Sequence, residues 1–175
     1  MTRWQLTVSL LILLLTAISS SAFASGTTVT VKISWTVLPF QSLFIAGDDS
    51  GDATVYSRFD LRQPTEADFA VGYIEECSAL TLNAASNIPW TVKVHALESD
   101  MGTSDDGTYI KPLTDFSLRS NGGPYSSSVA GCDQTLASGD TGEHTLIIDY
   151  KVDTEKETHK GGDYGLTLVY TITSI

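Results

Sequence analysis

Residues 28–37 read TVTVKISWTV, and in this stretch apolar residues alternate strictly with polar ones. The apolar positions are Val29, Val31, Ile33, Trp35 and Val37. An apolar residue at every second position is typical of a β-strand that buries one of its two faces. The stretch therefore predicts a ten-residue strand, and no turn signal interrupts it.

The same alternation recurs further along the chain. It is clearest at residues 90–96 (WTVKVHA), 146–152 (LIIDYKV) and 166–173 (LTLVYTIT). Weaker strands are predicted at residues 40–45, 54–59, 69–75, 79–83 and 109–118. Turns rich in Gly and Asp separate these strands, and only residues 65–70 (TEADFA) indicate a helical turn, capped by Thr65.

Seven or more short strands between such turns predict an all-β fold, an immunoglobulin-like antiparallel β-sandwich. An up-and-down barrel is the alternative, and the uneven strand spacing counts against it. Trp35 and Trp90 fall on the apolar faces of their strands, so both are predicted to lie in the core. Residues 162–164 (GDY) stand where the tyrosine corner of such sandwiches belongs.

The first 24 residues have the pattern of a secretory signal peptide. One charge, Arg3, precedes an apolar run at residues 6–18, and residues 22–24 (AFA) match the small-x-small pattern of a cleavage site. The run is too short to span about 30 Å of hydrocarbon as a helix. We therefore expect export, cleavage after Ala24, and a single domain at residues 25–175 with no membrane span.

The 175 residues include 10 Lys and Arg against 21 Asp and Glu, a net charge of −11. An acidic chain of this kind lacks the clustered cations that bind nucleic acid or anionic lipid. The chain has two cysteines, Cys77 and Cys132. In an oxidising compartment an even count predicts one disulfide between them. A metal site is the rival interpretation, but no CxxC or nearby histidine pair supports it.

Two groups of residues are candidates for ligand binding. Acidic turns could supply oxygen ligands to Ca²⁺, although neither turn matches an EF-hand loop, and solvated turns are the simpler interpretation. The acidic residues concerned are Asp48, Asp49, Asp52, Asp100, Asp105 and Asp106. Tyr109 and Tyr125 lie beside Gly-rich turns and could stack on a sugar. The sequence contains no nucleophile elbow, phosphate loop or paired metal-binding histidines, so we expect no enzyme and no obligatory cofactor.

Residues 87–94 (NIPWTVKV) resemble the first Trp-x-Leu-type strand of the WxL surface domains of bacteria. Residues 162–164, leading into residues 168–173 (LVYTIT), resemble the closing strand of those domains, with Tyr170 where the family has a second Trp. Residues 111–118 (KPLTDFSL) look like the mid-domain strand of related secreted sandwiches. The resemblance implies a non-catalytic extracellular sandwich used for attachment or assembly at the cell surface.

The leading hypothesis is therefore a secreted structural or adhesive cell-surface protein, as the subunit of an extracellular fibre or pilus. Its expected partners are further copies of itself or other surface proteins. The alternative is a secreted module that binds a glycan or the cell wall. After cleavage, the strand predicted at residues 28–37 would lie at a free end of the chain. It could complete its own sandwich, or it could be donated to an edge strand of a neighbouring molecule.

Overall fold

The computed structural model describes residues 29–47, 58–126, 129–154 and 160–175. The chain divides into two compact units, residues 1–36 and residues 37–175. Only residues 29–36 of the first unit are described, and they contain no helix or strand. The expected signal peptide lies outside the described residues, so its prediction is not addressed by the structure.

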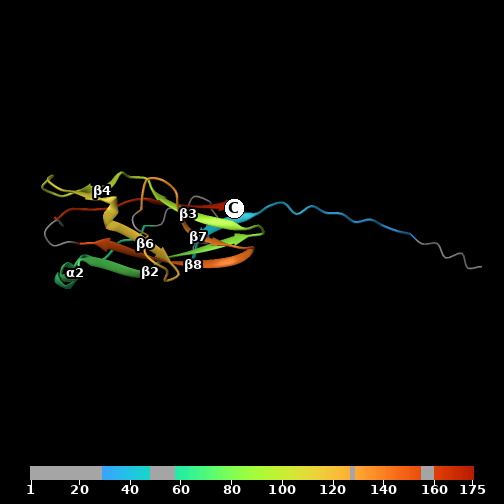
Figure 1. Ribbon diagram of the computed structural model, residues 1–175, viewed down its shortest axis with the longest axis horizontal. Helices are drawn as coiled ribbons and strands as arrows, with labels where there is room; N and C mark the ends of the chain where they lie inside the picture. Colours follow the sequence, from blue (N-terminus) through green and yellow to red (C-terminus); the bar gives the residue numbers. More distant parts are fainter. Residues whose placement is uncertain (1–28, 48–57, 127–128, 155–159) are drawn as a thin grey trace, which may run out of the picture. The chain divides into compact units, whose positions relative to one another are not determined.

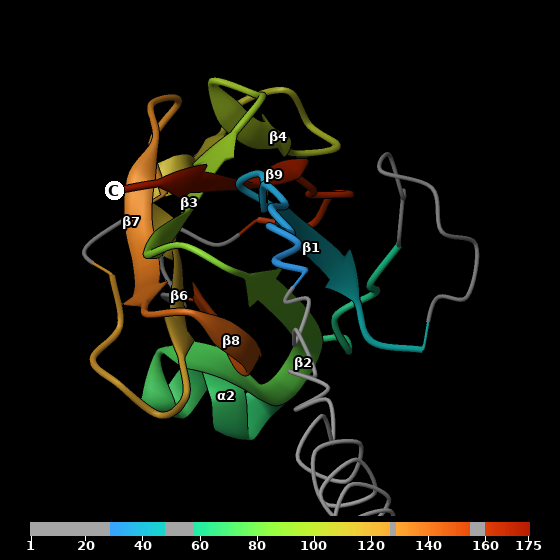
Figure 2. The same ribbon diagram turned by 90° about the vertical axis from the view of Figure 1, so that its right-hand side faces the viewer.

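The second unit is built from two antiparallel sheets. The four-stranded sheet has the order β1 (Gln41–Ile45), β2 (Tyr73–Ser86), β8 (Gly142–Asp153) and β6 (Phe116–Ser120). The three-stranded sheet has the order β7 (Gln134–Gly139), β3 (Trp90–Ala96) and β9 (Leu168–Ser174). Figure 1 shows the strands running along the long direction of the unit, and Figure 2 shows β3 and β9 on one side, with β2 and β8 on the other.

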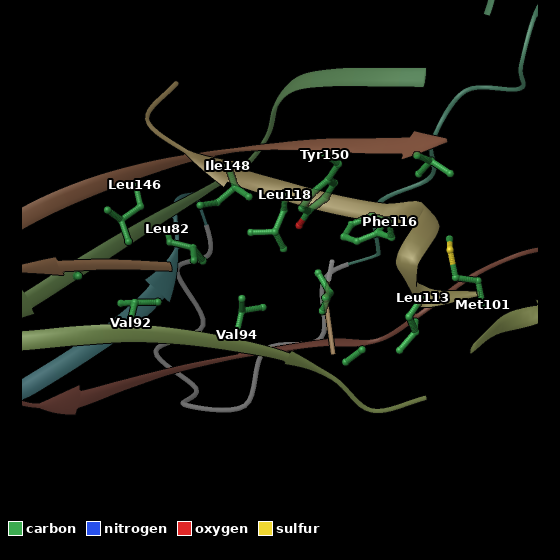
Figure 3. Packing of buried hydrophobic residues seen from close by; sticks show 14 of the residues in the cluster. Leu82, Val92, Val94, Met101, Leu113, Phe116, Leu118, Leu146, Ile148 and Tyr150 are labelled. Atoms are coloured by element: carbon green, nitrogen blue, oxygen red, sulfur yellow. The ribbon is translucent and has the colours of Figure 1, made fainter. Parts of the chain in front are cut away.

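Apolar side chains from both sheets form the core between them (Figure 3). Leu82, Leu146 and Ile148 come from the four-stranded sheet, and Val92 and Val94 come from the three-stranded sheet. Two facing antiparallel sheets, of four and three strands, with a shared apolar core have the architecture of an immunoglobulin-like sandwich. The predicted fold class is therefore confirmed.

Two local predictions are also confirmed. The Tyr164 hydroxyl donates a hydrogen bond to the backbone oxygen of Lys160, four residues upstream, at 2.8 Å, which is the geometry of a tyrosine corner. Helix α2 (Glu66–Val71) begins after Thr65, whose side chain accepts from the backbone N–H of Asp68. The Asp68 carboxylate accepts from the backbone N–H of Thr65 in return, so this is a capping box.

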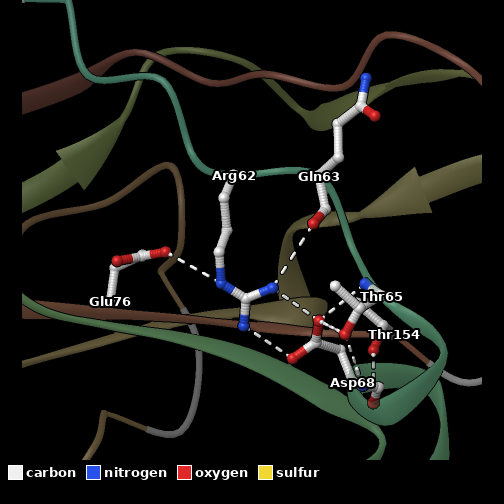
Figure 4. Close-up of polar contacts among 6 residues, drawn as sticks. All are labelled: Arg62, Gln63, Thr65, Asp68, Glu76 and Thr154. Atoms are coloured by element: carbon white, nitrogen blue, oxygen red, sulfur yellow. Dashed lines mark hydrogen bonds and ion pairs between the residues drawn. The ribbon is translucent and has the colours of Figure 1, made fainter.

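Arg62 connects this helix to the four-stranded sheet (Figure 4). Its guanidinium donates two hydrogen bonds to the Asp68 carboxylate, at 2.6 and 2.7 Å, and lies 3.4 Å from the Glu76 carboxylate in β2. The Arg62 side chain and the Thr65 bonds hold the pKa of Asp68 well below its usual range. This pairing stabilises the helical turn that precedes β2.

Residues 29–37 do not form the predicted strand, and Thr28 lies outside the described residues. Trp35 is exposed, so its predicted place in the core is wrong, whereas Trp90 is only 1% exposed and its prediction is confirmed. A strand requires a neighbour for its backbone groups, and residues 29–37 pair with none of the described strands. The segment therefore has an apolar face suited to burial, but this face is exposed in the single chain.

The other differences concern element boundaries. Residues 69–75 divide between α2 and β2, and residues 109–118 divide into β5 (Ile110–Pro112), a 3₁₀ turn at Leu113–Asp115 and β6. β5 pairs with β4 (Asp100–Thr103) in a separate two-stranded hairpin. β4 and β7 were not among the predicted strands, because their sequences, DMGT and QTLASG, lack large apolar residues in alternation. Residues 54–57 of another predicted strand lie outside the described residues.

Candidate functional site

Five large apolar side chains of the N-terminal segment, residues 29–37, are each between 70% and 80% exposed. They are Val29, Val31, Ile33, Trp35 and Val37, the alternating set found in the sequence. Burying one such side chain stabilises a protein or complex by about 1.5–3 kcal/mol. Burial of all five against a partner would therefore favour association strongly. Contiguous exposed apolar surface of this kind marks interaction sites.

The linker, residues 38–40, joins this segment to β1 at a fixed point. The Asn87 side chain accepts from the backbone N–H of Phe40 at 2.7 Å and donates to the backbone oxygen of Leu38 at 2.9 Å. The Ser86 hydroxyl also reaches the backbone oxygen of Phe40, at 3.2 Å. These bonds hold the linker at the end of β2, and the role of Asn87 in them was not predicted from the sequence.

β9 is the edge strand of the three-stranded sheet, and it pairs on one side with β3. Its core-facing residues, Leu168, Tyr170 and Ile172, lie opposite Ala96, Val94 and Val92 of β3. The β3 residues are fully buried, whereas the β9 residues are only partly buried. Partial burial at the edge shows that one side of the core is incompletely covered where β9 ends the sheet.

β1 contributes to the same incompletely covered region. It is an edge strand of the facing sheet, it lies close to β9, and its apolar residues Leu43 and Ile45 are also only partly buried. We call β9 together with these two β1 residues the open edge. Its exposed backbone groups and half-covered apolar side chains are the features that accept an added β-strand.

A pair of tyrosines ties β9 to the four-stranded sheet inside the open edge. The Tyr150 and Tyr170 hydroxyls lie 3.1 Å apart, within hydrogen-bond distance. Burial raises the pKa of Tyr170 well above its ordinary value, and burial raises the pKa of Tyr150 as well. Both hydroxyls are therefore neutral at physiological pH, and the pair holds β9 in place without charge.

The predicted disulfide is not formed in the structure: Cys77 and Cys132 are free thiols, and both are exposed. Cys77 lies in the bulge of β2, between its pairings at Glu76 and Leu80, whereas Cys132 immediately precedes β7 of the other sheet.

Two of the acidic residues proposed for Ca²⁺, Asp100 and Asp106, accept hydrogen bonds from their own part of the chain. Asp106 accepts from the Ser104 hydroxyl at 2.6 Å and from Lys160 Nζ at 2.9 Å, and these bonds hold its pKa well below its usual range. Asp100 accepts from the backbone N–H of Gly102 at 3.0 Å. Among the described residues, no three acidic, histidine or cysteine side chains lie close enough to share a metal ion.

Three of the candidate calcium ligands, Asp48, Asp49 and Asp52, lie outside the described residues. Calcium binding therefore stays a prediction. Comparing thermal unfolding in millimolar Ca²⁺ with unfolding in a chelator tests it, because a ligand of the folded state raises the Tm.

The two tyrosines proposed for sugar stacking are engaged within the protein. The Tyr125 hydroxyl donates to the Glu75 carboxylate at 2.6 Å, and the Arg119 guanidinium lies 4.5 Å from the centre of its ring. Burial and the bond to Glu75 raise the pKa of Tyr125. The Tyr109 ring packs edge-on against Tyr164, with ring centres 6.4 Å apart. These contacts assign both rings a structural use, and sugar binding stays a prediction.

A small pocket of about 260 Å³ lies beside Tyr125, between β6 and the start of β7. Leu118, Ser120, Pro124 and Leu136 contribute to its wall. Its volume is below the range of about 300–1,000 Å³ that is usual for small-molecule sites. The pocket therefore adds little support for a ligand-binding module.

Within the described part of the chain, no helix is long and apolar enough to cross a membrane. No protein-family model matches the chain, and no curated protein matches it. The resemblance to WxL domains accordingly stays an expectation.

Two solved structures are similar to the chain. One is the CsuC–CsuE chaperone–tip adhesion subunit pre-assembly complex from archaic chaperone-usher Csu pili of Acinetobacter baumannii, with 13% identity and a TM-score of 0.38. That likeness covers 78% of this chain and 40% of the other, so this chain spans less than half of it. The second is a chaperone-usher pilus whose structure concerns rod uncoiling, with 14% identity, a TM-score of 0.42, and coverage of 86% and 97%. At these values the likeness assigns the chain neither a family nor a function.

Proposed function

We propose that this chain is a non-catalytic, secreted structural subunit of an extracellular fibre. The fibre forms when the N-terminal segment, residues 29–37, of one copy adds as a strand to the open edge of the next. The observation that carries the proposal is the presence, in one chain, of an exposed alternating segment and an edge strand whose core-facing side is half covered.

The two surfaces match in pattern and in length. Nine residues in extended conformation span about 30 Å, and the seven residues of β9 span about 23 Å, at about 3.3 Å per residue. The donated segment can therefore pair along the whole of β9. Its five apolar side chains would all face the core, beside Tyr170 and Ile172, and its Thr, Lys and Ser side chains would face solvent.

In this arrangement each copy uses two different surfaces, the N-terminal segment as donor and the open edge as acceptor. Backbone hydrogen bonds to an edge strand give affinity, and alternate side chains that fill a core give specificity. A contact between two different surfaces of identical chains is heterologous, so it propagates into an open fibre unless its rotation closes a ring.

The test removes the donor and supplies it separately. A variant that lacks residues 25–36 should stay monomeric, and a synthetic peptide of residues 28–37 should bind it and raise its Tm. The matched control peptide has the same composition with its five apolar residues placed consecutively, so that no register turns all of them to one face. Equal binding of both peptides, or no binding of either, would contradict the proposal. Full-length protein that stays monomeric at high concentration and resists proteolysis through residues 29–37 would contradict it as well.

A further inference from the structure

The two ends of the sandwich differ, and their difference bears on how copies join. We call the end of the sandwich that holds the linker and Ile175 the linker end, and the end that holds β4 and β5 the hairpin end. At the linker end, Asn87 binds the linker, and the backbone N–H of Ile175 donates to the backbone oxygen of Pro89 at 3.3 Å. At the hairpin end, the backbone N–H of Gly165 donates to the oxygen of Met101 in β4 at 2.8 Å, just before β9 begins. Figure 1 shows β4 and the C-terminus at opposite ends of the unit.

The position of the linker restricts the direction in which a donated strand can run. β9 runs from Leu168 at the hairpin end to Ser174 at the linker end, antiparallel to β3. A donated strand that is parallel to β9 would end beside Ser174 and bring in its linker at the linker end. The acceptor's own outgoing linker already occupies that end, so successive copies would collide there.

An antiparallel donated strand avoids this collision. Its last residue, Val37, would lie beside Leu168, and its linker would arrive at the hairpin end of the acceptor. Incoming and outgoing linkers then lie at opposite ends of each copy, which permits a linear fibre. Antiparallel pairing is also slightly more stable per residue than parallel pairing.

Both surfaces that this direction brings together carry exposed apolar residues. At the linker end, the side chains of Leu38 and Phe40 are more than half exposed. At the hairpin end, Leu97 follows β3, Ile110 begins β5, and both are also more than half exposed. Exposed apolar residues at both ends would be covered when the linker end of one copy contacts the hairpin end of the next.

We propose that the linker end of one copy docks on the hairpin end of the next, with Leu38 and Phe40 against Leu97 and Ile110. This second interface rests on the proposed function, and its occupant is another copy of this chain. It fixes the polarity of the fibre and the spacing of its subunits, which strand donation alone leaves open.

The hairpin is held in a form suited to such a contact. The backbone N–H of Ser104 donates to the oxygen of Tyr109 at 2.8 Å, and that of Asp105 donates to the oxygen of Gly161 at 2.9 Å. Lys160 Nζ pairs with the Asp106 carboxylate across the same two loops at 2.9 Å. A rigid surface loses little conformational entropy on binding, so the hairpin is preorganised for docking.

Cysteine cross-linking in the full chain tests the direction and the contact together. Both native cysteines are first replaced by serine, and Leu38→Cys is then combined with either Ile110→Cys or Ile175→Cys. The docking model predicts a ladder of disulfide-linked oligomers on a non-reducing gel for the Ile110→Cys combination only. Ladders for Ile175→Cys, or for neither combination while the peptide of residues 28–37 still binds, would overturn the inference. Failure of peptide binding would instead remove the proposed function.

A second variant measures the apolar contact itself. Leu97→Asp with Ile110→Asp should leave peptide affinity within about twofold of the parent, because neither residue belongs to the open edge, while fibres dissociate at least tenfold faster. Ile147→Asp is the matched control, because Ile147 is an exposed apolar residue in the middle of β8 and should leave fibre dissociation unchanged. Equal fibre lifetimes for the double variant and the control would overturn the docking contact.

Discussion

Trp35 is the residue whose replacement should separate assembly from folding most sharply. Its side chain is exposed in the isolated chain, so Trp35→Ala should change the free energy of unfolding of the monomer by less than about 0.5 kcal/mol. In the donated strand the same side chain faces the acceptor core. Aromatic anchors of this kind cost about 2–4 kcal/mol when truncated, which corresponds to about 30- to 1,000-fold in Kd.

The assay titrates peptides of residues 28–37 into the chain that lacks residues 25–36. The parent peptide, the Trp35→Ala peptide and a Ser34→Ala control should be compared by isothermal calorimetry. Ser34 lies on the polar face, so its replacement should change Kd by less than about threefold. Chemical denaturation of the full-length Trp35→Ala variant, at concentrations too low for assembly, gives the free energy of unfolding of the monomer.

Two outcomes would refute the reasoning. If Trp35→Ala and Ser34→Ala weaken binding equally, the alternating face does not enter the core, and the proposed register is wrong. If Trp35→Ala lowers the stability of the monomer by several kcal/mol, the side chain packs within its own copy, and the segment is not a donor.

Three further predictions concern the sandwich itself. Tyr170→Phe removes one member of the buried hydroxyl pair and should lower the free energy of unfolding by about 1–2 kcal/mol, measured by urea denaturation, because the Tyr150 hydroxyl loses its partner. The backbone N–H of Ser78 and the Arg119 side chain lower the pKa of Asp149, so the carboxylate stabilises the fold above its unfolded pKa of about 3.9 and this contribution disappears as the pH falls further. Asp149→Asn should therefore flatten the decrease in urea midpoint between pH 5 and pH 2. Both thiols of the folded protein should react with a maleimide without prior reduction, because both are exposed, and mass spectrometry that finds no adduct would restore the disulfide.

Periodicity predicted the sandwich well because it reports which faces are buried, and burial is local to each strand. The strand at residues 90–96 follows the alternation in its burial, with every apolar position enclosed by the facing sheet. Residues 29–37 carry the same pattern, but the pattern does not say which molecule supplies the partner. Strand order is a non-local property, so the free side of β9 and its proximity to β1 could not be deduced from sequence.

The candidate site was predicted only in part for the same reason. The residues proposed as a donor strand could be recognised because they belong to one continuous segment with one period. The Asn87 clamp depends on hydrogen bonds to Leu38 and Phe40, which lie nearly fifty residues away in the chain. The positions of the two cysteines, Cys77 in β2 and Cys132 in the bend before β7, likewise depend on how the chain folds, and the count of cysteines contains no such information.

The direction of pairing distinguishes donation between copies from completion within one copy. The three-residue linker fixes the C-terminal end of residues 29–37 at the linker end, so a strand of the same copy could lie beside β9 only in parallel. Donation to another copy is antiparallel, and it places Lys32 near Thr173 of that copy rather than near Val169 of its own.

This difference can be measured in the full chain with both native cysteines replaced by serine. Lys32→Cys combined with Thr173→Cys should give disulfide-linked oligomers, whereas Lys32→Cys combined with Val169→Cys should give none. The three positions lie on the outward faces of their strands, so the substitutions leave the core intact. A cross-linked monomer from the Val169→Cys combination would show that the segment completes its own sandwich, and the fibre proposal would then be wrong.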